Sequence, residues 1–570
     1  MKKGDSCRLF SAYAAKYCYF IAAFLLVLAP LLPNHYFPWL SFHSDFIATT
    51  ALWVLLLGVF LSYDRFELPF AALVCLFVSF IPLIQIVSGL IYFSGDGIIT
   101  SAYLFGFCAA IVVGRNLSIK GRTSFLLVLA ACTLTVAVIS VFLAIVQWLD
   151  LRQWSLWIVE IPPGTPSSAN LAQPNNLATL FCFGMFSLIF IAEKYSFSKV
   201  TSLLIAVLLC FGLALTQSRT AWLIVGTFVI WWLWKRSLLG DLQRLTMPAV
   251  IGFVGLYILF INLLPVFSEV LYMAVEPQDR SAELGIRGVI WSQLIDSLWA
   301  KPFFGYGWNQ VTVALVSMAA DPVVSKSAYF EHSHNLFIDL LVWNGVLIGG
   351  GLIVCIIWWG VRSAISCRSL ESWFALSCIG AITIHSLLEF PFAYAYFLFP
   401  IGLVIGSLPK LKSGKNLTIY CPRWFVFCCL FASSIFIINI YFEYRLIEDD
   451  SRLLRFETRG IGDIRAEQKA PDVVILSQLR EFNRFSRTEV NDNLNSEEIK
   501  WMEKIAHRYP KPNSLLRYSL ALFLNGRAEE GKIELFRLRK LYGEDAYQVA
   551  KNNLKLMSEK YPQLQALDLP

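Results

Sequence analysis

The chain has 570 residues, of which 57% are hydrophobic and only 15% are charged, and its mean hydropathy is +0.60. This composition excludes an ordinary soluble protein and indicates a polytopic membrane protein that sits in a lipid bilayer. The formal net charge is +7, but the tail from Glu443 onward carries 22 basic and 21 acidic residues. The basic excess therefore lies in the apolar part of the chain, and we predict no nucleic-acid partner.

Apolar runs that approach the ~20 residues needed to cross a bilayer recur along the first 442 residues. They predict an all-α fold with about thirteen transmembrane spans, near 17–32, 46–62, 68–92, 98–113, 125–149, 174–193, 202–215, 220–234, 247–267, 337–361, 373–388, 395–408 and 425–442. We expect a transmembrane domain over 1–442. Its longest polar interruption is the loop 268–336.

Loops rich in lysine and arginine alternate with loops that are poor in them. Basic residues concentrate at the N-terminus, with Lys2 and Lys3, and in loops such as 115–122 and 410–423. Basic loops face the cytoplasm. The outward set is then 33–45, 150–173, 268–336 and the tail 443–570. The first apolar run is expected to remain as a span, because no small-residue cleavage site follows it.

The apolar stretch 202–234 contains one polar break, Thr216–Thr220. A straight helix of this length would measure about 50 Å, whereas the apolar core of a bilayer is about 30 Å thick. Two short helices with a polar turn at Arg219 therefore fit better. An arginine at this depth is functional by default when it lines a polar cavity, and the alternative is a side chain that snorkels to the interface.

Two of the six histidines, His332 and His334, stand one residue apart where the long loop meets an apolar run. Imidazole can take up a proton near neutral pH, which indicates chemistry at a membrane surface. The alternative is that this polar group only caps the following helix. A zinc site on the pair is disfavoured, because catalytic zinc usually has three protein ligands and no third has suitable spacing. None of the 13 cysteines falls in a predicted outward segment, so no disulfide framework is expected.

The tail 443–570 has a different composition from the rest of the chain. Amphipathic helical patterns occur near 472–486, 496–508, 513–525, 528–541 and 545–561. They predict a small helical domain outside the membrane, which we expect to assist binding or stability rather than to perform chemistry.

Several motifs appear in a characteristic order. They are Gln173-Pro174-Asn175-Asn176, Thr216-Gln217-Ser218-Arg219, Gly285-Ile286-Arg287, Pro302-Phe303-Phe304-Gly305-Tyr306-Gly307, His332-Ser333-His334-Asn335 and His385-Ser386-Leu387-Leu388-Glu389. Together they resemble the O-antigen ligase/polymerase superfamily, and most closely the bacterial protein O-oligosaccharyltransferases of the PglL type. Asn176 departs from the family pattern, in which histidine is frequent at that position.

The resemblance implies a glycosyltransferase in the bacterial inner membrane, with its active site facing the periplasm. The donor would be an oligosaccharide on undecaprenyl pyrophosphate, and the acceptor a serine or threonine hydroxyl on a periplasmic protein such as a pilin. No cofactor and no metal would be needed.

The implied roles divide between basic and imidazole groups. Arg219 and Arg287 would bind the pyrophosphate through their planar guanidinium groups, which can donate two parallel hydrogen bonds. Arg280 is a weaker candidate for this role. His334 would act as the base, and His332 would position it or take its place. The supporting residues would be Asn335, Gln173, Asn175, His385 and Glu389. For the last two, a polar pair at a helix end is an equal alternative.

Two other functions stay open at this point. An O-antigen ligase acting on lipid A-core, or an O-antigen polymerase, would use the same site on a carbohydrate acceptor, although the helical tail argues against both. A transporter would be expected to show two repeated halves with discontinuous spans, and no internal repeat is visible in the sequence.

Overall fold

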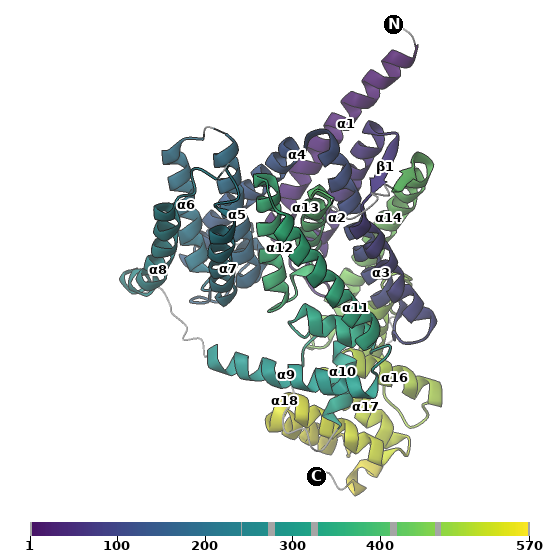
Figure 1. The fold of residues 1–570 in the computed structure, drawn as a ribbon. Coiled ribbons are helices and arrows are strands. Elements are labelled where there is room, and N and C mark those ends of the chain that lie inside the picture. The colour runs from purple at the N-terminus through teal and green to yellow at the C-terminus, as the bar shows by residue number, and fades with distance from the viewer. Residues whose placement is uncertain are drawn as a thin grey trace. The chain divides into compact units, whose positions relative to one another are not determined.

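The computed structural model is described over residues 3–154, 156–195, 197–240, 242–271, 280–320, 329–410, 419–461 and 469–567. It is almost entirely helical (Figure 1). The helices are α1 (Lys3–Leu28), α2 (Phe42–Ser62), α3 (Phe70–Val87), α4 (Ser94–Trp148), α5 (Pro174–Lys194), α6 (Lys199–Leu215), α7 (Arg219–Lys235), α8 (Met247–Val270), α9 (Arg280–Ala300), α10 (Val311–Ala319), α11 (Leu336–Ser366), α12 (Leu370–Ser386), α13 (Ala395–Ser407), α14 (Arg423–Glu457), α15 (Ser477–Arg487), α16 (Ser496–Arg508), α17 (Pro512–Leu524) and α18 (Ala528–Met557).

Within the described part of the chain, eight helices are long and apolar enough to cross a membrane: α1, α2, α3, α4, α5, α8, α11 and α14. Two shorter apolar helices, α6 and α13, accompany them. Helix α4 has 55 residues and would measure about 80 Å, far more than one bilayer pass. Its backbone is non-helical at Gly121, between the predicted spans 98–113 and 125–149, so it has room for two passes. The total of thirteen spans stays a prediction.

The predicted break in the stretch 202–234 is confirmed. Helix α6 ends at Leu215 and α7 begins at Arg219, and each has 17 residues. Ser218 caps α7, because its side chain accepts a hydrogen bond from the amide of Ala221. Gln217 has a positive φ of 47°, which lets the chain reverse between the two helices.

The chain divides into two compact units. The first comprises Met1–Val78, Tyr103–Gln278 and Trp358–Asn439, and the second comprises Ser79–Ala102, Asp279–Ile357 and Ile440–Pro570. The predicted boundary after residue 442 falls inside α14, and the division into a transmembrane and an outer domain stays a prediction.

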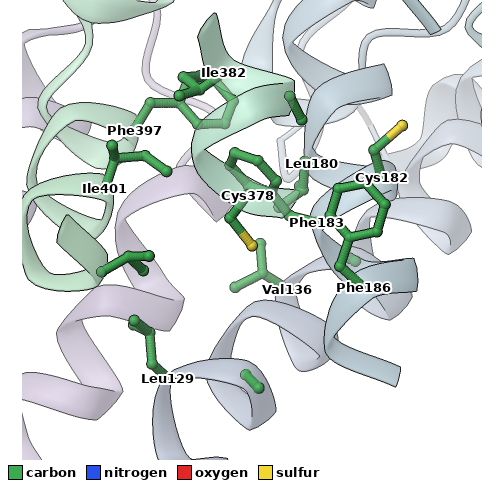
Figure 2. Packing of buried hydrophobic residues seen from close by; sticks show 14 of the residues in the cluster. Leu129, Val136, Leu180, Cys182, Phe183, Phe186, Cys378, Ile382, Phe397 and Ile401 are labelled. Carbon is green, nitrogen blue, oxygen red and sulfur yellow. The ribbon is translucent and has the colours of Figure 1, made fainter. Parts of the chain in front are cut away.

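In the first unit, apolar side chains of α4, α5, α12 and α13 form a common core (Figure 2). Phe190 of α5 stacks on Phe374 of α12 with ring centroids 4.6 Å apart. A Cβ atom on Gly184 would lie only 2.5 Å from the Cβ of Ala137, so glycine is what lets α5 approach α4 closely.

One small β-sheet interrupts the predicted all-α fold. Strand β1 (Arg65–Leu68) pairs antiparallel with β2 (Ile419–Pro422). Glu67 in β1 accepts charged hydrogen bonds from Arg115 and Lys410, each at 2.9 Å. The sequence does not predict this pair, because four-residue strands give too short a pattern to recognise.

In the second unit, the tail helices form their own core with α10. Met502, Leu515, Leu522 and Leu538 are buried there together with Val316 of α10. The predicted helices of the tail are confirmed as α15 to α18, and Gly543, with φ of 85°, divides α18 where two helices were expected.

Candidate active site

Helix α5 begins in the motif Gln173-Pro174-Asn175-Asn176. Side chains at its start bind the buried carboxylate of Glu389. The side-chain Nε2 of Gln173 donates to Oε2 of Glu389 at 3.3 Å, and the side-chain Nδ2 of Asn175 donates to Oε1 of Glu389 at 3.2 Å. Ser218 donates from its hydroxyl to Oδ1 of Asn175 at 2.6 Å. We call Gln173, Asn175, Ser218 and Glu389 the amide–carboxylate cluster. It joins three predicted motifs that are distant in sequence.

Arg219 is the first residue of α7 and follows the Ser218 of this cluster. Its side chain is exposed. The positive end of the helix dipole lies at the same place and favours an anion. The role of Arg219 in binding phosphate stays a prediction.

His385 is fully buried, at the end of α12. Its Nδ1 lies 2.9 Å from the hydroxyl of Thr179, and its carbonyl oxygen accepts a hydrogen bond from the amide of Glu389 at 2.8 Å. The ring is thus part of the packing beneath the cluster. The backbone of His385 also bonds to Glu389, and the supporting role of the side chain stays a prediction.

The predicted histidines belong to the second unit, in a loop over residues 329–335 that we call the histidine loop. The backbone amide of Ser333 donates to Oδ1 of Asp339 at 2.9 Å. Its carbonyl oxygen accepts from the indole nitrogen of Trp291 at 2.7 Å. The loop is therefore held from α11 on one side and from α9 on the other.

Asn335 ends the loop as the cap of α11. Its Oδ1 accepts hydrogen bonds from the amides of Phe337 at 3.0 Å and Ile338 at 3.3 Å. Asn335 thus caps α11, whereas the alternative of capping by the histidines stays untested. His334, one residue before it, has a positive φ of 58°, which a non-glycine residue adopts only at a cost.

His332 faces a buried acid. Its Nδ1 lies 3.8 Å from Oδ2 of Asp339, a side chain with no exposed surface. The two side chains are thus neighbours at ion-pair distance, without a hydrogen bond between these two atoms. Asp339 was not among the predicted site residues, although an acid at the fourth residue of an apolar run is itself a signal of function.

Arg287 lies on α9, one helical turn before Trp291 and on the same face. Since Trp291 bonds to the histidine loop, Arg287 is carried on the part of α9 that meets that loop. Arg280 begins the same helix.

Among the residues that the structure describes, no three His, Cys, Asp or Glu side chains are grouped so that they could hold a metal ion. The imidazole beside a buried acid, and the arginines at the start of α7 and on α9, are residue types that suit acid–base chemistry on a phosphate-containing substrate.

These features define a polytopic helical membrane protein with two imidazoles in one loop and an exposed arginine at the start of α7. Residues 204–355 match the family described as O-Antigen ligase. Residues 373–556 match the family described as "Virulence factor membrane-bound polymerase, C-terminal".

The chain is also similar to two proteins of Acinetobacter baylyi. It is 30% identical to a general O-oligosaccharyltransferase over 92% of both chains. It is 28% identical to a ComP-specific O-oligosaccharyltransferase, over 87% of this chain and 89% of that protein. The chain belongs to the O-oligosaccharyltransferases, which are glycosyltransferases of the O-antigen ligase type.

Proposed function

We propose that this protein transfers an oligosaccharide en bloc from undecaprenyl pyrophosphate to serine or threonine hydroxyls of periplasmic proteins such as pilins. The observation that carries the proposal is the histidine loop, in which two imidazoles stand between α9 and α11 with the buried Asp339 beside them. The relatives favour this function over the ligase, polymerase and transporter alternatives.

In the proposed reaction, His334 takes the proton of the acceptor hydroxyl as the oxygen attacks the anomeric carbon. The bond from that carbon to the pyrophosphate oxygen breaks, and undecaprenyl pyrophosphate leaves with the bonding electrons. Arg219 and Arg287 stabilise the charge that develops on the leaving group. His332, which lies beside Asp339, positions His334 or takes its place.

The test is to produce the protein together with a lipid-linked glycan and a candidate pilin, and to measure the mass of the pilin. We expect an increase equal to the whole glycan, which disappears when the acceptor serine or threonine of the pilin is replaced by alanine. A glycan found on lipid A-core, with an unchanged pilin, would contradict the proposal.

We infer a topology of thirteen spans, with the loop 268–336 and the tail in the periplasm of a bacterial inner membrane. Alkaline phosphatase, which is active only in the periplasm, should be active when fused after residue 300 or after residue 470. A fusion after Arg236, in a predicted cytoplasmic loop, is the control and should be inactive. An inactive enzyme at either outer position would overturn this topology.

Arg219→Lys and Arg287→Lys are each expected to reduce transfer from the lipid-linked donor, by about 10- to 100-fold if one charge-assisted hydrogen bond is lost. Lysine keeps the positive charge but lacks the planar guanidinium group that donates two hydrogen bonds to one phosphate. The measurement is the initial rate at equal amounts of protein in the membrane. Arg236→Lys, at the other end of α7, is the matched control. Near-normal rates in both test variants would remove bidentate binding from the mechanism.

A further inference from the structure

The end of α9 and the residues after it expose three large aromatic side chains. Trp299 is 84% exposed, Phe303 61% and Phe304 73%. Burying an aromatic side chain of this size is worth about 1.5–3 kcal/mol, so three exposed together indicate a surface that is covered in the working protein.

The exposed aromatic surface continues one face of α9. Ile290, Leu294 and Ser297 are buried on one side of this helix. Gly288, Ser292, Ile295 and Trp299 are exposed, and their spacing of four, three and four residues places them on the opposite side. None of these four residues is charged, although Asp296 beside them is also exposed. The exposed side of α9 therefore ends in two apolar side chains, Ile295 and Trp299.

The segment after α9 is fixed to α11 by backbone hydrogen bonds. The amide of Val346 donates to the carbonyl of Pro302 at 2.8 Å, and the amide of Tyr306 donates to the carbonyl of Val342 at 2.7 Å. Gly345 has φ of 72°, and a Cβ atom there would lie 2.3 Å from the carbonyl oxygen of Phe303. The two aromatic residues are thus held at the bend of α11.

That bend is at the end of one membrane pass. From Val346 to Ser366, α11 continues for 21 residues, a length of about 31 Å that matches the apolar core of a bilayer. Val346 is 50% exposed and Leu347 68%, as expected for side chains that face lipid. Phe303 and Phe304 therefore adjoin the outermost lipid-facing turn of α11.

We propose that Trp299, Phe303 and Phe304 form an aromatic anchor that inserts into the surface of the lipid bilayer. Aromatic side chains concentrate at this level of a membrane, and a neighbouring lysine can extend its charge to the headgroups. Lys301 is that neighbour, with its Nζ 4.7 Å from the ring centroid of Tyr306.

The anchor gives α9 a fixed level relative to the bilayer. The same helix carries Arg287 and bonds through Trp291 to the histidine loop. Resting on the proposed function, the anchor would hold Arg287 and the imidazoles at the height where the pyrophosphate of a lipid-linked donor emerges. Its binding partner is the lipid surface itself.

The first test measures lipid contact and does not depend on activity. A photoreactive benzoylphenylalanine is placed at Phe303 or Phe304, and the full chain is reconstituted in vesicles of phosphatidylethanolamine and phosphatidylglycerol. Leu347 and Leu556, both 68% exposed, serve as matched controls on α11 and on the tail helix α18. We expect lipid adducts at 303, 304 and 347 but not at 556. Labelling at 303 and 304 no stronger than at 556 would overturn the anchor.

The second test measures positioning with the double variant Phe303→Ser/Phe304→Ser, which leaves the backbone hydrogen bonds of Pro302 available. With a long-chain donor in vesicles, we expect transfer to fall by about tenfold or more. With a short-chain donor in detergent, it should fall by less than about twofold. Equal losses with both donors would contradict the positioning role. If the unchanged protein transferred no glycan with either donor, the proposed function would be contradicted. The lipid adducts of the first test would then still show whether the aromatic anchor contacts lipid.

Discussion

His334→Ala is expected to abolish glycan transfer, whereas His332→Ala is expected only to reduce it. Removal of a general base typically lowers a rate by ~10²–10⁴-fold, which would erase product in a cell assay. His334 is the more firmly placed of the two, because it adjoins Asn335, whose side chain caps α11 through two amides. His332 lies further into the loop, with its Nδ1 3.8 Å from Oδ2 of Asp339. The measurements are acceptor glycosylation and retention of the lipid-linked donor, at matched amounts of membrane protein.

The backbone of His334 provides a sharp control. At φ of 58°, alanine is strained by about 1–2 kcal/mol, but glycine is not. If the imidazole is the base, His334→Gly and His334→Ala should both be inactive. An active His334→Gly beside an inactive His334→Ala would mean that the backbone, and not the ring, matters. Donor binding should survive in both variants, since the arginines are proposed to provide it.

The ranking of the two histidines can be tested through Asp339. If His332 is a positioning residue that works with this acid, Asp339→Asn should reduce transfer to about the level of His332→Ala. Equal loss in His332→Ala and His334→Ala would mean that the two imidazoles act as one unit.

The sequence predicts best those features that depend on periodic burial or on the thickness of a bilayer. The break before Arg219 follows from the length of the apolar run, and the tail helices follow from their amphipathic patterns. The helices α9 and α10 were not anticipated inside the long loop, because their apolar stripes are short and their partners lie elsewhere in the chain.

The site is less visible because its bonds join distant motifs. Glu389 was predicted only as supporting, yet it receives hydrogen bonds from Gln173 and Asn175, more than two hundred residues earlier. Ser218 was noted only as the residue before an arginine, but it also bonds to Asn175. No local pattern encodes such pairs. The catalytic and binding roles of these residues stay predictions, even though the motifs themselves are brought together.

The tail was expected to be accessory, but one of its arginines pairs with an acid at the start of α4. The guanidinium of Arg508 donates from Nε to Oδ2 of Asp96 at 2.8 Å and from Nη2 to Oδ1 at 2.9 Å, and both side chains are buried. Burial alone would lower the pKa of Arg508, but the charges of Asp96 and Glu331 outweigh it and hold that pKa above its ordinary value. Glu331 is the residue before His332, so this cation also acts on the histidine loop.

Arg508→Met is therefore expected to destabilise the protein by about 3–5 kcal/mol, because it leaves the carboxylate of Asp96 buried without its partner. The measurement is the melting temperature of the purified protein in detergent, together with the amount that remains monodisperse. Arg539→Met is the matched control in the same tail. Arg539 pairs with Glu544 at the exposed surface, where such a pair contributes about 0–1 kcal/mol.

The double variant Asp96→Asn/Arg508→Met separates a charge effect from a packing effect. Removing both charges leaves none uncompensated, so the double variant should be more stable than Arg508→Met alone. A melting temperature of Arg508→Met equal to that of Arg539→Met would show that the buried pair contributes little. A double variant as unstable as Arg508→Met would show that the loss comes from the packing contacts of the arginine side chain, and not from the unpaired acid.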